Sequence, residues 1–148
     1  MSGLPSAILF ACTMNAVRSP MAEGLMKRFH GKRVFVDSVG VKAQPVDGFA
    51  IAALDEVGID ISHHRPKTFE ELEDGSFDVI VSLSPEAQHK AVDLTRHMAC
   101  EVLFWHTFDP SIVEGCRETR LDAYRAVRDE LEQRILTTFP PPTMASVG

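Results

Sequence analysis

Short apolar runs alternate along this chain with stretches whose apolar residues recur at helical spacing. The runs have the length of buried strands, and they are residues 7–11, 34–36, 79–83 and 100–105. Strands without polar alternation are typical of a parallel sheet that is covered on both faces. The pattern therefore predicts an α/β fold: one three-layer sandwich, with a four-stranded parallel sheet and helices on both faces.

The helical stretches begin and end at recognisable signals. Ser19 before Pro20 predicts a helix N-cap, and Gly31 suits the end of that helix. Ser84 before a proline predicts a second start, and Thr68 with Glu71 has the capping-box spacing of a short helix. Two further apolar stripes predict a helix ending at Gly58 and a long closing helix: Ala50, Ala53, Leu54 and Val57, then Leu121, Tyr124, Val127, Leu131 and Ile135.

The length of 148 residues fits a single domain spanning residues 1–148, with a core of about 7–138. Residues 139–148 are rich in proline and predict a flexible tail. The formal net charge of −6 argues against nucleic acid or an anionic membrane as partner. No apolar run approaches the roughly 20 residues of a membrane span, and the start lacks a secretory pattern, so we expect a cytoplasmic protein.

Three cysteines and six histidines are the candidates for redox or metal chemistry. The cysteines show no CxxC spacing and no disulfide framework, and no His/Cys pair has zinc-finger spacing, so no metal site is expected. Cys100 starts a predicted strand and is interpreted as a core residue. His64 or Arg65 remains a candidate contact at the rim of a substrate site.

The segment between the first strand and the first helix carries the strongest functional signal. Cys12 ends the strand, and Arg18 lies at the start of the helix, on the edge where parallel sheets bind ligands. A loop running into a helix N-terminus offers backbone N–H groups to an anion, and a guanidinium holds two oxygens at once. Such a positive field favours the cysteine thiolate. We interpret the pair as a nucleophile and an oxyanion clamp; the alternative is a buried structural cysteine and a surface arginine.

The residues around this pair are expected to shape the loop. Asn15 tolerates a positive φ and is predicted to make the bend, unless it is an exposed turn residue. Ser19 is predicted to cap the helix and to donate toward the Cys12 sulfur, with capping alone as the alternative. The predicted substrate-binding set is Thr13, Met14, Asn15, Ala16, Val17 and Ser19.

Asp109 is the candidate for proton transfer. It follows the fourth predicted strand, on the same edge of the sheet as Cys12, and Pro110 stiffens the loop behind it. Attack by a cysteine on phosphorus requires a proton for the leaving oxygen and then a base for water. The alternative is an ordinary Asp-Pro turn.

The ordered motifs resemble those of the low-molecular-weight protein tyrosine phosphatases and the related thioredoxin-coupled arsenate reductases. The signature Cys-x5-Arg-Ser-Pro-x-Ala-Glu is matched by Cys12, Arg18, Ser19, Pro20, Ala22 and Glu23. The segments "DSVGV", "ALDEVGIDISHHRPK", "FDVIVSLSPEA", the Asp109-Pro110 pair and "YRAVRDELEQRI" follow in the family order, so the likeness spans roughly residues 7–136.

The resemblance implies that Cys12 is the nucleophile, Arg18 the oxyanion ligand and Asp109 the general acid and then base, with no metal or organic cofactor. The predicted activity is hydrolysis of phosphomonoesters, protein phosphotyrosine among them, through a phosphocysteine intermediate. The expected partner is a phosphorylated protein or small molecule, or arsenate. Two alternatives stay open: arsenate reduction by one catalytic cysteine with an external thiol, and a non-catalytic oxyanion sensor or adaptor.

The departures from the family pattern bear on the substrate. Met14 stands where the phosphatases usually have glycine, and Val17 stands where many have a second cysteine, so no disulfide forms within the loop. Ser111 and Ile112 replace two tyrosines, which leaves phosphotyrosine specificity open. The two further cysteines of the reductases are missing, so an internal relay is impossible and Cys116 is either a bystander or an improvised resolving thiol.

Overall fold

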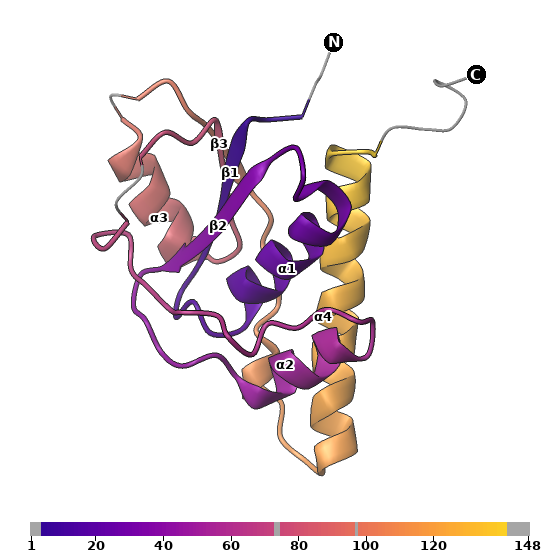
Figure 1. Ribbon diagram of the computed structural model, residues 1–148. Helices are drawn as coiled ribbons and strands as arrows, with labels where there is room; N and C mark the ends of the chain where they lie inside the picture. The colour runs from indigo at the N-terminus through magenta and orange to yellow at the C-terminus, as the bar shows by residue number, and fades with distance from the viewer. Residues whose placement is uncertain (1–3, 73–74, 97, 142–148) are drawn as a thin grey trace, which may run out of the picture.

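The computed structural model describes residues 4–72, 75–96 and 98–141. Its four strands form one parallel sheet in the order β2-β1-β3-β4 (Figure 1). The strands are β1 (Ala7–Cys12), β2 (Phe35–Gly40), β3 (Val79–Ser82) and β4 (Glu101–Phe104). The predicted parallel sheet is confirmed, with β2 at one edge and β4 at the other.

Helices cover both faces of the sheet. One layer contains α1 (Arg18–His30), α2 (Gly48–Asp55) and α4 (Arg117–Thr138), and the other contains α3 (Pro85–Leu94) (Figure 1). A short 3-10 turn, η1 (Pro110–Ile112), precedes α4. The predicted stripe of α4 is buried along its whole length: Leu121, Tyr124, Val127, Leu131 and Ile135. The three-layer sandwich is therefore confirmed.

Two predicted local structures differ from the fold. The α1 helix begins at Arg18 after Val17, without a side-chain cap, so Ser19 is inside the helix and not its N-cap. Thr68 and Glu71 exchange the predicted reciprocal capping bonds, but residues 68–72 form only a turn. Ser84, in contrast, accepts from the backbone N–H of Ala87 and caps α3 as predicted.

The core continues past the predicted boundary at residue 138. Phe139 is buried, its ring centroid lies 6.3 Å from that of Trp105, and its carbonyl lies 2.7 Å from His30 Nε2. The tail predicted from residue 139 therefore starts too early, because an aromatic anchor holds the chain there. Residues 142–148 of that prediction lie outside the described residues. Over the described ranges, no helix has the length and hydropathy needed to cross a membrane.

Candidate active site

The loop between β1 and α1 turns its carbonyl groups away from the candidate site. The backbone N–H groups of residues 41, 42, 44 and 47 donate to the carbonyls of residues 12, 13, 14 and 16. Within the described chain, the N–H groups of residues 13–17 donate to no backbone or side-chain acceptor. The carbonyls are thus anchored to the segment after β2, and the free N–H groups form a concave anion-binding surface.

This arrangement depends on a close approach of β2. A Cβ built on Gly40 would lie 2.6 Å from the backbone nitrogen of Asn15, and it would also collide with the carbonyl of Lys42. Only glycine leaves room for the loop to lie against the end of β2 at this position.

Cys12, Arg18 and Asp109 come together around the open side of the loop. Cys12 is only 2% exposed, and its Sγ lies 2.9 Å from Ser19 Oγ and 3.4 Å from the Ser19 backbone nitrogen, which donates to it. Arg18 Nη1 donates to the carbonyl of Thr107 at 3.0 Å, and Nη2 lies 4.0 Å from Asp109 Oδ2. The three groups that the sequence separates by 97 positions, from 12 to 109, therefore share one site.

The cavity at this site has a volume of about 120 Å³. That is the space of roughly four waters at about 30 Å³ each, which suits a small oxyanion. Its walls come from the loop, the segment before α2 and the start of η1: Cys12, Met14, Ala16, Val17, Arg18, Gln44, Pro45, Asp47, Asp109 and Ser111. Met14 lies in the wall and also packs against the core.

Asn15 holds the loop from behind. It is fully buried with φ of 54°, which confirms the predicted bend and excludes the exposed-turn alternative. Its Nδ2 donates to Ser19 Oγ at 2.9 Å and to Ser38 Oγ at 3.0 Å. Its Oδ1 accepts from the Lys67 backbone N–H at 2.9 Å and faces His64 Nε2 at 3.0 Å. The amide therefore uses its full hydrogen-bonding capacity.

Ser19 joins this support to the thiol. Its Oγ accepts from Asn15, lies within hydrogen-bond distance of Cys12 Sγ, and is 3.3 Å from the carbonyl of Val39. The predicted interaction with the sulfur is present, although the predicted cap is not. The same hydroxyl donates to the Val39 carbonyl, so it ties the residues beside the sulfur to β2.

His64 lies behind the loop, not at the substrate rim. Its side chain is 8% exposed, and Nε2 donates to Asn15 Oδ1, because that oxygen only accepts. Burial lowers the pKa of His64, against the opposing effect of Glu23, whose Oε1 lies 3.7 Å from Nδ1. Neither His64 nor Arg65 lines the cavity at Cys12, and the bond of His64 to Asn15 shows that the rim interpretation is wrong for His64.

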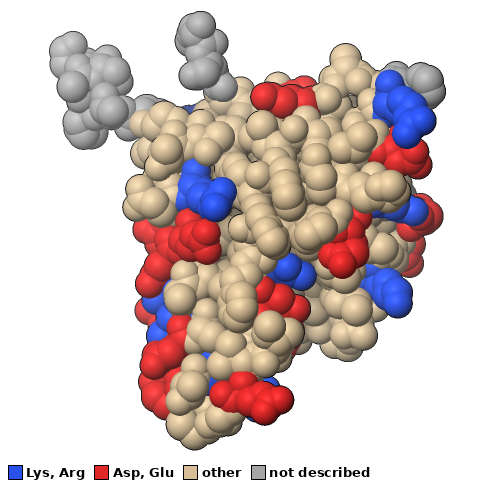
Figure 2. All heavy atoms as spheres, turned by 180° about the vertical axis from the view of Figure 1, so that it is seen from behind, with Lys and Arg blue, Asp and Glu red and all other residues tan. Residues whose placement is uncertain are grey.

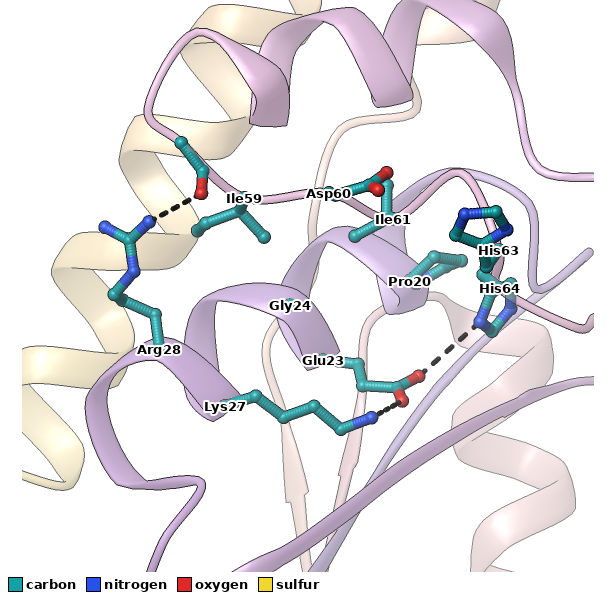
Figure 3. Close-up of a pocket in the computed structure, with 11 residues that line it drawn as sticks. Pro20, Glu23, Gly24, Lys27, Arg28, Ile59, Asp60, Ile61, His63 and His64 are labelled. Atoms are coloured by element: carbon teal, nitrogen blue, oxygen red, sulfur yellow. Dashed lines mark hydrogen bonds and ion pairs between the residues drawn. The ribbon is translucent and has the colours of Figure 1, made fainter.

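A second cavity of about 450 Å³ lies on this rear side, between α1 and residues 58–64 (Figure 3). Glu23 projects into it and lies between Lys27 and His64, with Lys27 Nζ 2.6 Å from Oε2 (Figure 3). The other carboxylate oxygen of Glu23 accepts from Ser38 Oγ at 2.6 Å. The wall of the rear cavity is therefore continuous, through Ser38 and Asn15, with the loop around Cys12.

Sequence reasoning missed Asp47. This residue caps α2, accepts from Tyr124 Oη at 3.0 Å and lines the Cys12 cavity. Burial and the neighbouring Asp47 carboxylate raise the pKa of Tyr124. Asp47 in front of a helical stretch is a capping signal, but its position in the cavity depends on how the segment after β2 folds over the loop.

The remaining thiols lie outside the Cys12 cavity. Cys100 is partly buried and packs beside the core on the α3 face. Cys116 is exposed at the start of α4, with its Sγ 3.3 Å from Thr119 Oγ1. Among the described residues, no three His, Cys, Asp or Glu side chains are grouped as metal ligands.

The fold and the loop that joins Cys12 to Arg18 are those of a class of cysteine-dependent enzymes. The profile of the family described as "Low molecular weight phosphotyrosine protein phosphatase" matches residues 7–140, so the chain belongs to that family. This confirms the resemblance seen in the ordered motifs.

Individual relatives carry different activities in their names. The chain is 35% identical to the "Arsenate reductase" of Halalkalibacterium halodurans, over 88% of this chain and 92% of that protein. It is 32% identical to the "Glutaredoxin arsenate reductase" of Synechocystis sp., over 86% and 92%. The structure of the "YwlE arginine phosphatase from Geobacillus stearothermophilus" superposes with a TM-score of 0.74 at 26% identity, over 88% of each chain.

Proposed function

We propose that this protein hydrolyses phosphomonoesters through a phosphocysteine intermediate. The observation that carries the proposal is the juxtaposition at the loop: a thiol, a ring of unbonded backbone N–H groups, a guanidinium and a carboxyl group around one small cavity. Binding an anion requires the N–H groups and Arg18, but it requires neither a thiol nor an acid. The combination therefore favours catalysis over a non-catalytic sensor.

The chemistry needs two displacements at phosphorus. In the first, the Cys12 thiolate forms an S–P bond, the ester P–O bond breaks, and Asp109 gives a proton to the leaving oxygen. In the second, Asp109 takes a proton from water, the water oxygen attacks phosphorus, and the S–P bond breaks to release phosphate and thiolate. Arg18 and the N–H groups of the loop stabilise the charge on the three non-bridging oxygens throughout.

Arsenate reduction is the second candidate, and the names of the curated relatives favour it. Arsenate has the shape and charge of phosphate, so the same loop would bind it. Cys12 would form an S–As bond while one As–O bond breaks, and the departing oxygen would leave as water with a proton from Asp109. An external thiol would then attack Cys12 sulfur, form a mixed disulfide and leave two electrons on arsenic as arsenite. A second external thiol would restore Cys12. The proposal uses an external donor because neither Cys100 nor Cys116 lines the Cys12 cavity.

Hydrolysis of p-nitrophenyl phosphate between pH 5 and 8 tests the main proposal. We expect turnover by the wild type, none by Cys12→Ser, and a loss of about 10²–10⁴-fold in kcat for Asp109→Asn. Asp60→Asn is the matched control and should leave kcat unchanged, because Asp60 accepts from Ser62 as Asp109 accepts from Ser111 but lies at the rear cavity, away from Cys12. A wild type that is inert while it still binds phosphate would refute hydrolysis, and thiol-dependent arsenite release would then decide for the second candidate.

A further inference from the structure

The outer edge of β4 carries hydrogen-bonding groups that no strand of the described chain uses. The backbone N–H groups of residues 101, 105 and 107 donate to the β3 side, at the carbonyls of residues 78, 82 and 83. Since alternate residues of a parallel strand bond to opposite sides, the N–H and C=O groups of residues 102, 104 and 106 point outward. Such an edge is a template for another extended segment.

Beyond the exposed Glu101 at the start of β4, the side chains along this edge are mostly apolar. Phe104 is 44% exposed and stacks on His106 at 5.7 Å, while Val102 and Leu103 are only partly buried. Farther along the chain, Phe108 and Ile112 are 51% and 65% exposed on either side of Asp109. Figure 2 shows the face turned away in Figure 1: its upper middle is largely free of Lys, Arg, Asp and Glu, whereas charged side chains gather at the margins and near the centre of the view.

This edge leads directly to the candidate active site. Thr107 is three residues after β4, and its carbonyl accepts from Arg18. The parallel register places Phe104 beside Ser82 and Ser82 beside Ala11, one residue before Cys12. A strand added outside β4 would be three strand spacings from β1, or about 14 Å. About four extended residues at roughly 3.3 Å each span that distance.

We propose that β4 binds the polypeptide substrate by β-augmentation. An extended, uncharged segment rich in β-branched residues pairs with residues 102–106, and the phosphorylated residue about four positions away enters the Cys12 cavity. The proposal rests on the proposed function for the identity of the anchored residue. In this proposal, backbone pairing and the apolar surface of Phe104 and Phe108 select the substrate. They take the role of the two tyrosines that related phosphatases carry after the acid and that this chain lacks.

Two labelled phosphotyrosine peptides test it by fluorescence anisotropy on Cys12→Ser. One carries an alternating Val-Thr segment four residues from the phosphotyrosine. The other has prolines in that segment, which prevent backbone pairing. Each peptide is made in two versions, one with the segment before the phosphotyrosine and one with the segment after it. We expect about tenfold tighter binding of the Val-Thr peptide in one of the two orders. Phe104→Pro should remove this difference, because it deletes an outward N–H at an edge where proline is tolerated.

The controls separate this proposal from the proposed function. Phe35→Ala alters an aromatic residue that is 52% exposed at the opposite edge, on β2, and should leave the difference unchanged. Phe104→Lys, which keeps the backbone N–H, should weaken binding of both peptides. If p-nitrophenyl phosphate is inert, hydrolysis fails while the peptide comparison still reports on β4. If the two peptides bind equally, substrate pairing at β4 is wrong. It is also wrong if Phe104→Pro converts a dimer into a monomer in sedimentation, because the segment paired with β4 is then another copy of this chain.

Discussion

On the cavity side of residues 13–17, the backbone N–H groups have no acceptor in the described chain, whereas on the opposite side the Asn15 amide has every donor and acceptor bonded. On the cavity side, which we call the front of the loop, the N–H groups lack acceptors within the described chain, and a bound anion can supply them. On the opposite side, which we call the rear, the Asn15 amide is buried and all its hydrogen-bonding groups have partners. A buried amide group without a partner would cost about 1–3 kcal/mol in the free energy of folding. The same short loop is thus open to ligand on one side and fixed by the fold on the other.

The comparison predicts different consequences for damage on each side. A change at the front removes chiefly interactions that form with the substrate anion, so catalysis suffers more than stability. A change at the rear leaves buried groups without partners, so stability and catalysis fall together. A change at the outer end of the rear network should alter only the pH dependence of stability.

Arg18→Lys tests the front and should have the largest effect on turnover. Lysine keeps the charge but loses the two-pronged geometry, so we expect kcat for p-nitrophenyl phosphate to fall about 10²–10³-fold. The free energy of unfolding should fall by only about 1 kcal/mol, because the bond from Arg18 Nη1 to the Thr107 carbonyl is lost. Arg28→Lys is the matched control in the same helix, because Arg28 bonds to the carbonyls of Val57 and Gly58 away from the Cys12 cavity. Retention of more than a tenth of wild-type kcat would mean that the N–H groups alone hold the anion.

Asn15→Ala tests the rear. The substitution leaves the Lys67 N–H, His64 Nε2 and the two serine hydroxyls without their partner, and it places alanine at a φ of 54°. We expect a loss of about 3 kcal/mol in the free energy of unfolding by urea, together with a fall of about tenfold in kcat. Asn15→Gly should lose roughly 1 kcal/mol less, because glycine adopts that φ freely. Equal losses for the two variants would show that the backbone conformation contributes nothing.

Much of the front was predictable from sequence because it is local. Cys12, the loop and Arg18 are consecutive, and a strand followed by a helix is enough to aim the N–H groups at one point. Asp109 was predictable because the ends of parallel strands share an edge. Asp47 was not, since its place in the cavity depends on the segment after β2 lying across the loop.

The rear escaped prediction because it is built from tertiary contacts. Ser19 was predicted to cap the helix and to contact the Cys12 sulfur; the contact is present, but in place of the cap its hydroxyl bonds to Asn15 and Val39. The predicted strand at residues 34–36 stopped short because Asp37 and Ser38 interrupt the apolar run. Those two polar residues bond to Lys67 and to the Asn15–Glu23 network. Because polar residues of a buried network lie within β2, its hydrophobic pattern predicts a strand that is too short.

His64→Gln gives the smallest effect and tests whether the rear network titrates. Burial lowers the pKa of His64 in the folded protein below its ordinary value of 6.5, with Lys67 acting in the same direction and Glu23 and Asp37 against it. Above pH 6.5 the folded and unfolded forms are both neutral, so this residue adds no pH dependence. Below it the unfolded chain binds a proton that the folded protein resists, and stability falls with pH.

The melting temperature should therefore decrease more between pH 7 and pH 5 in the wild type than in His64→Gln, whose amide still donates to Asn15 without titrating. His63→Gln is the control, because His63 is the exposed neighbour and should keep the wild-type slope. Identical slopes of melting temperature against pH in all three proteins would mean that Glu23 offsets the effect of burial on His64. The stability of the rear network would then not depend on the titration of this residue.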